Sequence, residues 1–238
     1  MAGFELEKHE CEPGPGELRY RWNLFNVGDS PTASDGRPGE RMNQELPFRV
    51  ALLVVVVASV TIVALHYIGA SVAGERVSRN GEGLLMLVSL RLAGLVLFAA
   101  TMAYLVNPRW MIWAAVPLAN AVRWLGAAVD LLGIVLLAWT LRTLGRNLTD
   151  TVTTRPQHSL VTTGPYRWVR HPYYSTTLLL VGGAGMLAAN SLIGVLGLVV
   201  FGLLVMRTPS EEQMLIDRFG DEYRAYMGRT GRFVPRLR

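Results

Sequence analysis

Residues 161–174, V-T-T-G-P-Y-R-W-V-R-H-P-Y-Y, place a turn and a polar break directly before an apolar segment. Gly164 and Pro165 indicate the turn. Pro172 fits the first position of a helix, because its fixed φ suits that position and its missing N–H would be unpaired there anyway. The free N–H groups of such a first turn favour an anionic or strongly accepting group. We therefore expect a ligand site where this helix begins.

The composition of the chain is that of a membrane protein. Of 238 residues, 51% are hydrophobic and 17% are charged, and the mean hydropathy is +0.30. The formal charge of +5 comes almost entirely from arginines outside the apolar runs, because Lys8 is the only lysine. This favours anionic membrane lipids as partners and argues against nucleic acid. Cys11 is the only cysteine and the histidines lack ligand spacing, so neither an internal disulfide nor a metal site is predicted.

The apolar runs predict an all-α polytopic membrane protein with about five transmembrane helices. The predicted spans are residues 48–68, 84–106, 121–141, 173–189 and 192–206. Residues 1–46 form a polar arm rich in Gly, Pro, Glu and Arg, which is expected to be mobile. The rest divides into two helices within residues 47–110 and a three-helix core within residues 111–238. Gly182 and Gly183 predict close helix packing in that core.

Charged residues inside the predicted spans need an explanation, because lipid disfavours them. Arg91 lies near the start of the second span and is expected to extend toward the headgroups. Asp130 lies inside the third span and requires a partner, for which Arg91 and Arg123 are the candidates. We interpret Asp130 as half of a structural ion pair rather than as a catalytic group.

The segments that flank the last two spans are expected on one side of the membrane. The clusters T-V-T-T and S-L-V-T-T predict a short extended segment before the fourth helix. Pro209 and Ser210, just before two glutamates, are expected to open a C-terminal amphipathic helix along the membrane surface. Residues 142–172 and the tail are rich in arginine, so the positive-inside rule places them on the cytoplasmic face. We expect an integral protein of the inner or plasma membrane whose site faces the cytoplasm.

Polar side chains gather on that predicted face. They are Arg142, Asn147, His158, Tyr166, Arg170, His171, Arg207, Glu211 and Glu212. Solvation alone does not explain such a convergence at the edge of a membrane, so these residues are predicted to form a functional site.

Four motifs in this region resemble a known family. They are L-R-T-L-G-R-N, H-x-L-V-T-x-G-P-Y-x-x-x-R-H-P-x-Y, R-T-x-x-E-E-x-x-L and F-G-x-E-Y-x-x-Y. Their order resembles the isoprenylcysteine carboxyl methyltransferase family and, more loosely, the phospholipid methyltransferases, over about residues 141–235. The resemblance implies a membrane-embedded pocket for S-adenosylmethionine, closed by the tail and open laterally to lipid, with S-adenosylhomocysteine as product.

The positions of these motifs assign roles to particular residues. The cofactor is expected to contact His158, Ser159, Leu160, Val161, Tyr166, Arg170, His171, Pro172, Tyr173, Tyr174 and Glu211. Within this set Glu211 would take the amino group of the cofactor. The substrate is expected to meet Arg142, Asn147 and Arg207, with Arg207 at its carboxylate. Pro209 and Ser210 stand where the prenylcysteine enzymes tend to have further acids, so the choice between Glu211 and Glu212 stays open.

The nature of the methyl acceptor decides which residues are catalytic. A carboxylate is already ionised at neutral pH and needs no base, and an arginine can orient it through two hydrogen bonds. Arg142 and Arg207 are the candidates for this role. An amine must lose a proton, and Glu212 or His158 would then have to act as the base.

The predicted function is therefore carboxyl O-methylation of an isoprenylcysteine-like or other lipophilic small molecule that enters from the bilayer. Two alternatives keep the fold: N-methylation of a phospholipid or amine, and an NADPH-dependent reduction of the steroid 5-alpha-reductase type, whose enzymes have a loosely similar G-x-Y-x-x-x-R-H-P-x-Y segment. A non-catalytic lipid-binding or scaffold protein is a third class, but it would leave the polar residues without a role. The sequence does not specify the oligomeric state.

Overall fold

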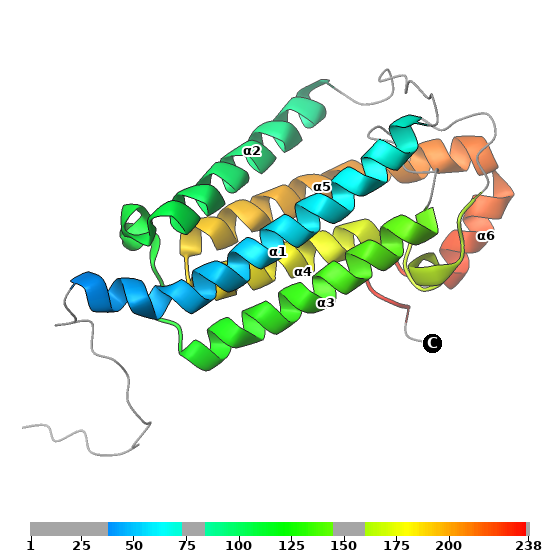
Figure 1. Cartoon of the computed structure of the whole chain (residues 1–238). Helices are drawn as coiled ribbons and strands as arrows, with labels where there is room; N and C mark the ends of the chain where they lie inside the picture. Colours follow the sequence, from blue (N-terminus) through cyan, green and yellow to red (C-terminus); the bar gives the residue numbers. More distant parts are fainter. Residues whose placement is uncertain (1–37, 73–83, 145–159, 237–238) are drawn as a thin grey trace, which may run out of the picture. The chain divides into compact units, whose positions relative to one another are not determined.

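The computed structural model describes residues 38–72, 84–144 and 160–236. Their regular elements are α1 (Pro38–Val72), α2 (Leu84–Val106), the 3-10 helix η1 (Pro108–Ala114), α3 (Asn120–Leu144), the 3-10 helix η3 (Gly164–Arg167), α4 (Pro172–Ala188), α5 (Ser191–Phe219) and α6 (Asp221–Arg229) (Figure 1). No strand occurs within these ranges, where the only ladder pairs are two isolated bridges. The predicted extended segment falls largely on residues 145–159, outside the described residues, and residues 160–163 have no regular structure.

Four of the described helices are long and apolar enough to cross a membrane: α1, α2, α3 and α5. This confirms the all-helical membrane class. The remaining predicted span, the fourth in the chain, is α4, which has only 17 residues and packs between α3 and α5. Thus α4 is shorter than the roughly 20 residues of an ordinary transmembrane helix. The bounds of α2 agree with the prediction, and α4 begins at Pro172 as expected.

The prediction of a separate helix that opens at Pro209 is wrong. Instead α5 continues without a break through Pro209 and ends at Phe219. Transmembrane helices tolerate proline where neighbouring helices support the turn. The hydroxyl of Thr208, beside the proline, donates to the carbonyl of Leu204. The helix ends at Gly220, whose φ of +54° lies in the left-handed region that favours glycine. The tail is therefore the end of α5 followed by the short helix α6.

Close packing of α3 against α4 depends on glycine. A Cβ atom added to Gly183 would lie 2.3 Å from the Oδ1 atom of Asp130, and one added to Gly126 would lie 2.8 Å from the carbonyl oxygen of Gly183. Glycine at both positions lets the two backbones meet, as in other membrane helix pairs. The close packing predicted for the three-helix core also occurs between α4 and α5, where Gly185 lies against Gly194.

The expected ion pair between Asp130 and an arginine is wrong. Arg123 instead forms two hydrogen bonds with Glu45 of α1, at 2.9 and 2.7 Å. Asp130 is fully buried against Gly183, and neither of its oxygens has a hydrogen-bond partner among the described residues. The physical reason is distance, because Arg123 lies about 10 Å from Asp130 along the axis of α3. The other candidate, Arg91, is exposed on α2.

Candidate functional site

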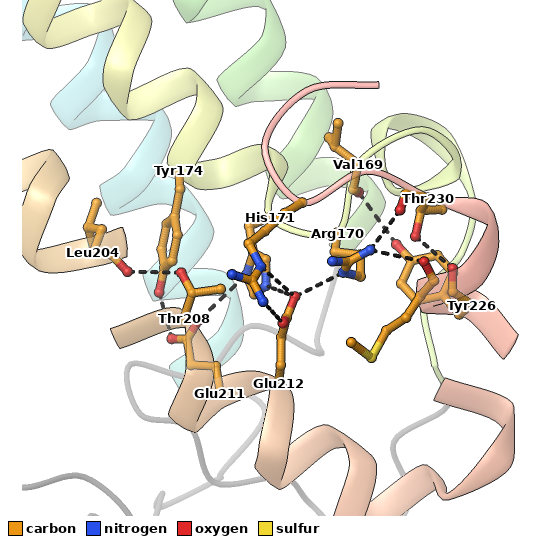
Figure 2. Close-up of polar contacts among 12 residues, drawn as sticks. Val169, Arg170, His171, Tyr174, Leu204, Thr208, Glu211, Glu212, Tyr226 and Thr230 are labelled. Carbon is orange, nitrogen blue, oxygen red and sulfur yellow. Dashed lines mark hydrogen bonds and ion pairs between the residues drawn. The ribbon is translucent and has the colours of Figure 1, made fainter. Parts of the chain in front are cut away.

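Two adjacent carboxylates of α5 meet one imidazole at the start of α4. The Nδ1 atom of His171 lies 3.6 Å from Oε2 of Glu211, and its Nε2 atom lies 3.3 Å from Oε1 of Glu212. Figure 2 shows the ring between the two acids. Because α4 begins where α5 approaches its end, the antiparallel packing of these helices brings together two motifs about 40 residues apart in sequence.

Glu212 is enclosed by cations. Its Oε1 atom is 2.9 Å from the Nε atom of Arg170, and its Oε2 atom is 2.6 Å from the Nη2 atom of Arg232. The side chain is only 5% exposed. Nearby positive charges favour the ionised form of a carboxyl group, so Glu212 is an anion held between two guanidinium groups and is a poor proton acceptor.

Glu211 has a different environment. Its Oε1 atom accepts a hydrogen bond of 2.6 Å from the hydroxyl of Tyr174 and lies 2.9 Å from the Nε atom of Arg207, one helical turn earlier. Its side chain is 15% exposed, three times the exposed fraction of Glu212. The two neighbouring acids therefore differ: one belongs to a closed ionic cluster, and the other is the more accessible.

Aromatic rings form a wall beside the acids. The rings of His171 and Tyr174 stack with their centroids 5.4 Å apart and an interplanar angle of 16°. The ring centroid of Phe233 lies 5.9 Å from that of His171 and 6.0 Å from that of Phe201 in α5. Such rings offer a flat apolar surface beside a polar cluster, which suits a ligand with both kinds of group.

Hydrogen bonds connect the segment before α4 to α6 and to the residue that follows α6. The hydroxyl of Tyr226 donates to the carbonyl of Tyr166 at 2.6 Å. Arg170 donates to the carbonyls of Met227 and Thr230, the second of which is labelled in Figure 2. Burial raises the pKa of Tyr226 to about 12, and burial also raises the pKa of Tyr166. Both hydroxyls therefore keep their protons at neutral pH, so Tyr226 remains a hydrogen-bond donor.

The structure places most of the predicted site residues at one end of the helices. Those near the two acids are Tyr166, Arg170, His171, Pro172, Tyr173, Tyr174 and Arg207. Leu160 and Val161 are partly buried in the irregular segment before η3. Arg142 is exposed in the last turn of α3 and has no hydrogen bond or ion pair with another described residue. Asn147, His158 and Ser159 lie outside the described residues.

Sequence reasoning missed three contributors after α6. They are Thr230, Arg232 and Phe233, which contact Arg170, Glu212 and His171 respectively. No pattern in the tail R-T-G-R-F-V-P-R-L-R distinguishes Arg232 from the other arginines around it. Only the meeting of the tail with α4 and α5 identifies it. Within the part of the chain that the structure describes, no group of three or more His, Cys, Asp or Glu residues is placed to hold a metal ion.

Buried ions and stacked rings at one end of apolar helices are the features of an integral membrane protein with a candidate ligand site. The comparisons narrow this class. Residues 124–217 match the family model of the isoprenylcysteine carboxyl methyltransferase (ICMT) family. This match confirms, over that part of the chain, the resemblance that the motifs predicted.

Curated proteins are similar to this chain over part of their length. Protein-S-isoprenylcysteine O-methyltransferase B of Arabidopsis thaliana is 33% identical over 113 residues, which are 46% of this chain and 57% of that protein. The nickel-cobalt-cadmium resistance protein NccN of Alcaligenes xylosoxydans xylosoxydans is 32% identical over 115 residues, which are 48% of this chain and 53% of that protein. The chain thus spans a little over half the length of these curated relatives.

A solved structure shares the fold. It is that of the eukaryotic intramembrane Ras methyltransferase ICMT, which is 23% identical to this chain and superposes with a TM-score of 0.50. The match covers 78% of this chain and 67% of that chain. At this identity the likeness supports a common arrangement of helices.

Proposed function

We propose that this protein is an integral membrane methyltransferase that uses S-adenosylmethionine to methylate a lipophilic carboxylic acid, such as an isoprenylcysteine-like compound. The observation that carries the proposal is the meeting of Glu211 with His171 and Tyr174 inside the family-matched segment. S-adenosylmethionine, when bound, supplies an electrophilic methyl group on a sulfonium. The chain's own residues then have to bind the cofactor, orient the acceptor and exclude water.

The chemistry of the side chains fits this cofactor. Its ammonium group needs a carboxylate, and Glu211 is the more exposed of the two acids. Its adenine needs flat apolar surfaces, which the stacked rings of His171 and Tyr174 provide. Glu212 is already neutralised by Arg170 and Arg232, so we assign the ammonium to Glu211. These observations support Glu211 in the choice between the two acids that the motifs left open.

The charge of the cluster favours an acidic acceptor. Among the described residues of the cluster, three guanidinium groups, those of Arg170, Arg207 and Arg232, face two carboxylates. The cofactor has one more positive than negative charge, so an anionic acceptor lowers the net positive charge of the site and a cationic amine raises it. A carboxylate also needs no base, which agrees with the poor basicity of Glu212. Arg207 is our candidate to orient the acceptor carboxylate. Because arginines surround the cluster, we propose that this end faces the cytoplasm.

Binding of radiolabelled S-adenosylmethionine and of NADPH to the detergent-solubilised protein tests the cofactor. We expect S-adenosylmethionine to bind, and Glu211→Gln to weaken that binding by at least about ten-fold through loss of a charge-assisted contact. Asp130→Asn is the matched control, because it makes the same acid-to-amide change in another helix, away from the site. Normal binding by Glu211→Gln would show that the pocket is misplaced. Binding of NADPH alone would identify a reductase, and binding of neither would favour a scaffold protein.

The acceptor is tested by incubating the protein with a lipid extract and methyl-labelled cofactor. A methyl ester releases labelled methanol on alkaline hydrolysis, whereas an N-methyl group does not. We expect the label in the lipid phase to be released by base. Label that is stable to base and remains with an amine headgroup would contradict the carboxylic acceptor and favour N-methylation.

A further inference from the structure

The chain after α6 forms part of the candidate site. We call residues 230–233 the C-terminal strap. The strap runs parallel to residues 168–171: the N–H of Gly231 donates to the carbonyl of Trp168 at 3.0 Å, the N–H of Arg170 donates to Gly231 at 2.9 Å, and the N–H of His171 donates to Arg232 at 3.0 Å. The strap is thus fixed through its backbone. The family match ends at residue 217 and does not include it.

A further backbone contact holds the end of the strap. The hydroxyl of Ser175 donates to the carbonyl of Phe233 at 2.6 Å, while the Phe233 ring packs beside those of His171 and Tyr174. None of these contacts involves the guanidinium group of Arg232. Removing that group should therefore leave the strap in place, so its contribution can be separated from folding.

Arg232 is the only strap side chain that reaches an acid of the site. Its Nη2 atom is 2.6 Å from Oε2 of Glu212, and its Nε atom is 3.3 Å from Oε1 of the same carboxylate. The guanidinium group therefore spans both oxygens, which fixes the rotation of the carboxyl group. The side chain is 45% exposed, so it lies at the outer edge of the cluster, whereas Glu212 is buried beneath it.

We propose that Arg232 is a positioning residue for cofactor binding and that it acts through Glu212. Held by Arg232, the Glu212 carboxylate keeps Arg170 and the Nε2 edge of His171 in place, which leaves Glu211 to meet the ammonium group of the ligand. Without Arg232, Glu212 loses one of its two guanidinium partners and can turn toward the ammonium in competition with Glu211. This inference rests on the proposed function.

Equilibrium binding of radiolabelled S-adenosylmethionine to purified variants tests the inference. We expect Arg232→Ala to weaken binding by about five-fold, a moderate loss because the arginine is partly exposed. Arg232→Lys should restore part of that loss, because an ammonium group replaces one of the two contacts. Arg236→Ala is the matched control, because it removes another arginine of the same tail. Arg236 donates to the Gly228 carbonyl and contacts no acid among the described residues, so this variant should bind the cofactor normally.

A double-mutant cycle separates positioning from direct contact. If Arg232 acts through Glu212, then Arg232→Ala should change binding by less than about two-fold when Glu212→Gln is already present. An undiminished effect in that background would show that Arg232 contacts the ligand directly, and the proposal would be wrong. We also expect the ligand-free Arg232→Ala protein to unfold within about 2 °C of wild type, because the backbone holds the strap. A larger drop that parallels the loss of binding would assign Arg232 a purely structural role.

The two proposals fail in different ways. If wild type does not bind S-adenosylmethionine, the proposed function is wrong and the role of Arg232 falls with it. If wild type binds and Arg232→Ala binds equally well, only the role of Arg232 is wrong.

Discussion

Replacing Gly183 by alanine should loosen the contact between α3 and α4, whereas the same change at Gly182 should not. A Cβ atom at position 183 would lie 2.3 Å from Oδ1 of Asp130, 2.6 Å from its Cγ atom and 2.8 Å from the carbonyl oxygen of Gly126. Carbon atoms do not approach other heavy atoms so closely, and one of the three is backbone. A Cβ atom at position 182 would have nothing within 4 Å.

These contacts set the size of the effect. Overpacking of this kind costs about 1–3 kcal/mol, because the helices must move apart. At Gly182 the change should instead stabilise the helix by up to about 1 kcal/mol, the difference in helix propensity between alanine and glycine. The two variants should therefore differ by about 2–4 kcal/mol, which corresponds to roughly 5–15 °C in apparent Tm for a chain of this length.

Thermal unfolding in detergent, followed by circular dichroism, measures this difference between Gly183→Ala and Gly182→Ala. Adding Asp130→Ala to Gly183→Ala should recover part of the loss, because it removes the two nearest atoms and leaves only the carbonyl of Gly126. Equal unfolding temperatures for the two glycine variants would refute the packing of α4 against α3 at this point. They would also question the position of His171, which α4 places in the site.

Two further predictions concern charge and pH. Glu45→Gln should lower the free energy of unfolding by about 3 kcal/mol, because it leaves Arg123 buried without its carboxylate. Asp130→Asn should change it by less than about 0.5 kcal/mol, since Asp130 has no charged partner among the described residues to lose. Equal losses in thermal unfolding would favour the ion pair of Asp130 that was predicted from the sequence. Burial raises the pKa of Tyr226 to about 12, above the value of about 10 for a free tyrosine. The contribution of this hydroxyl to the free energy of unfolding is therefore fully present below about pH 10 and is lost as the pH rises toward 12. Tyr226→Phe should flatten that alkaline decline in apparent Tm, and an unchanged decline would contradict the burial of this hydroxyl.

Tertiary partners account for the predictions that were wrong. Asp130 and Arg123 share α3, so their proximity in sequence suggested a pair, but Arg123 instead reaches Glu45, which lies 78 residues away. Pro209 suggested the start of a helix, but it lies within α5, which continues to Phe219. The role of Arg142, by contrast, stays a prediction: α3 leaves its side chain exposed, with no hydrogen bond or ion pair to another described residue.

The sequence by itself determined which apolar runs form helices and which end of the molecule carries the polar residues. These are local properties: in lipid a helix satisfies its own backbone, so the length of each apolar run predicts a span, and Pro172 marks where α4 begins. Only the tertiary structure decided which cation neutralises which acid. Glu212 takes its arginines from positions 42 residues before and 20 residues after it. Such choices depend on which helix faces meet and how far each side chain reaches, and a one-dimensional pattern of residues does not contain that information.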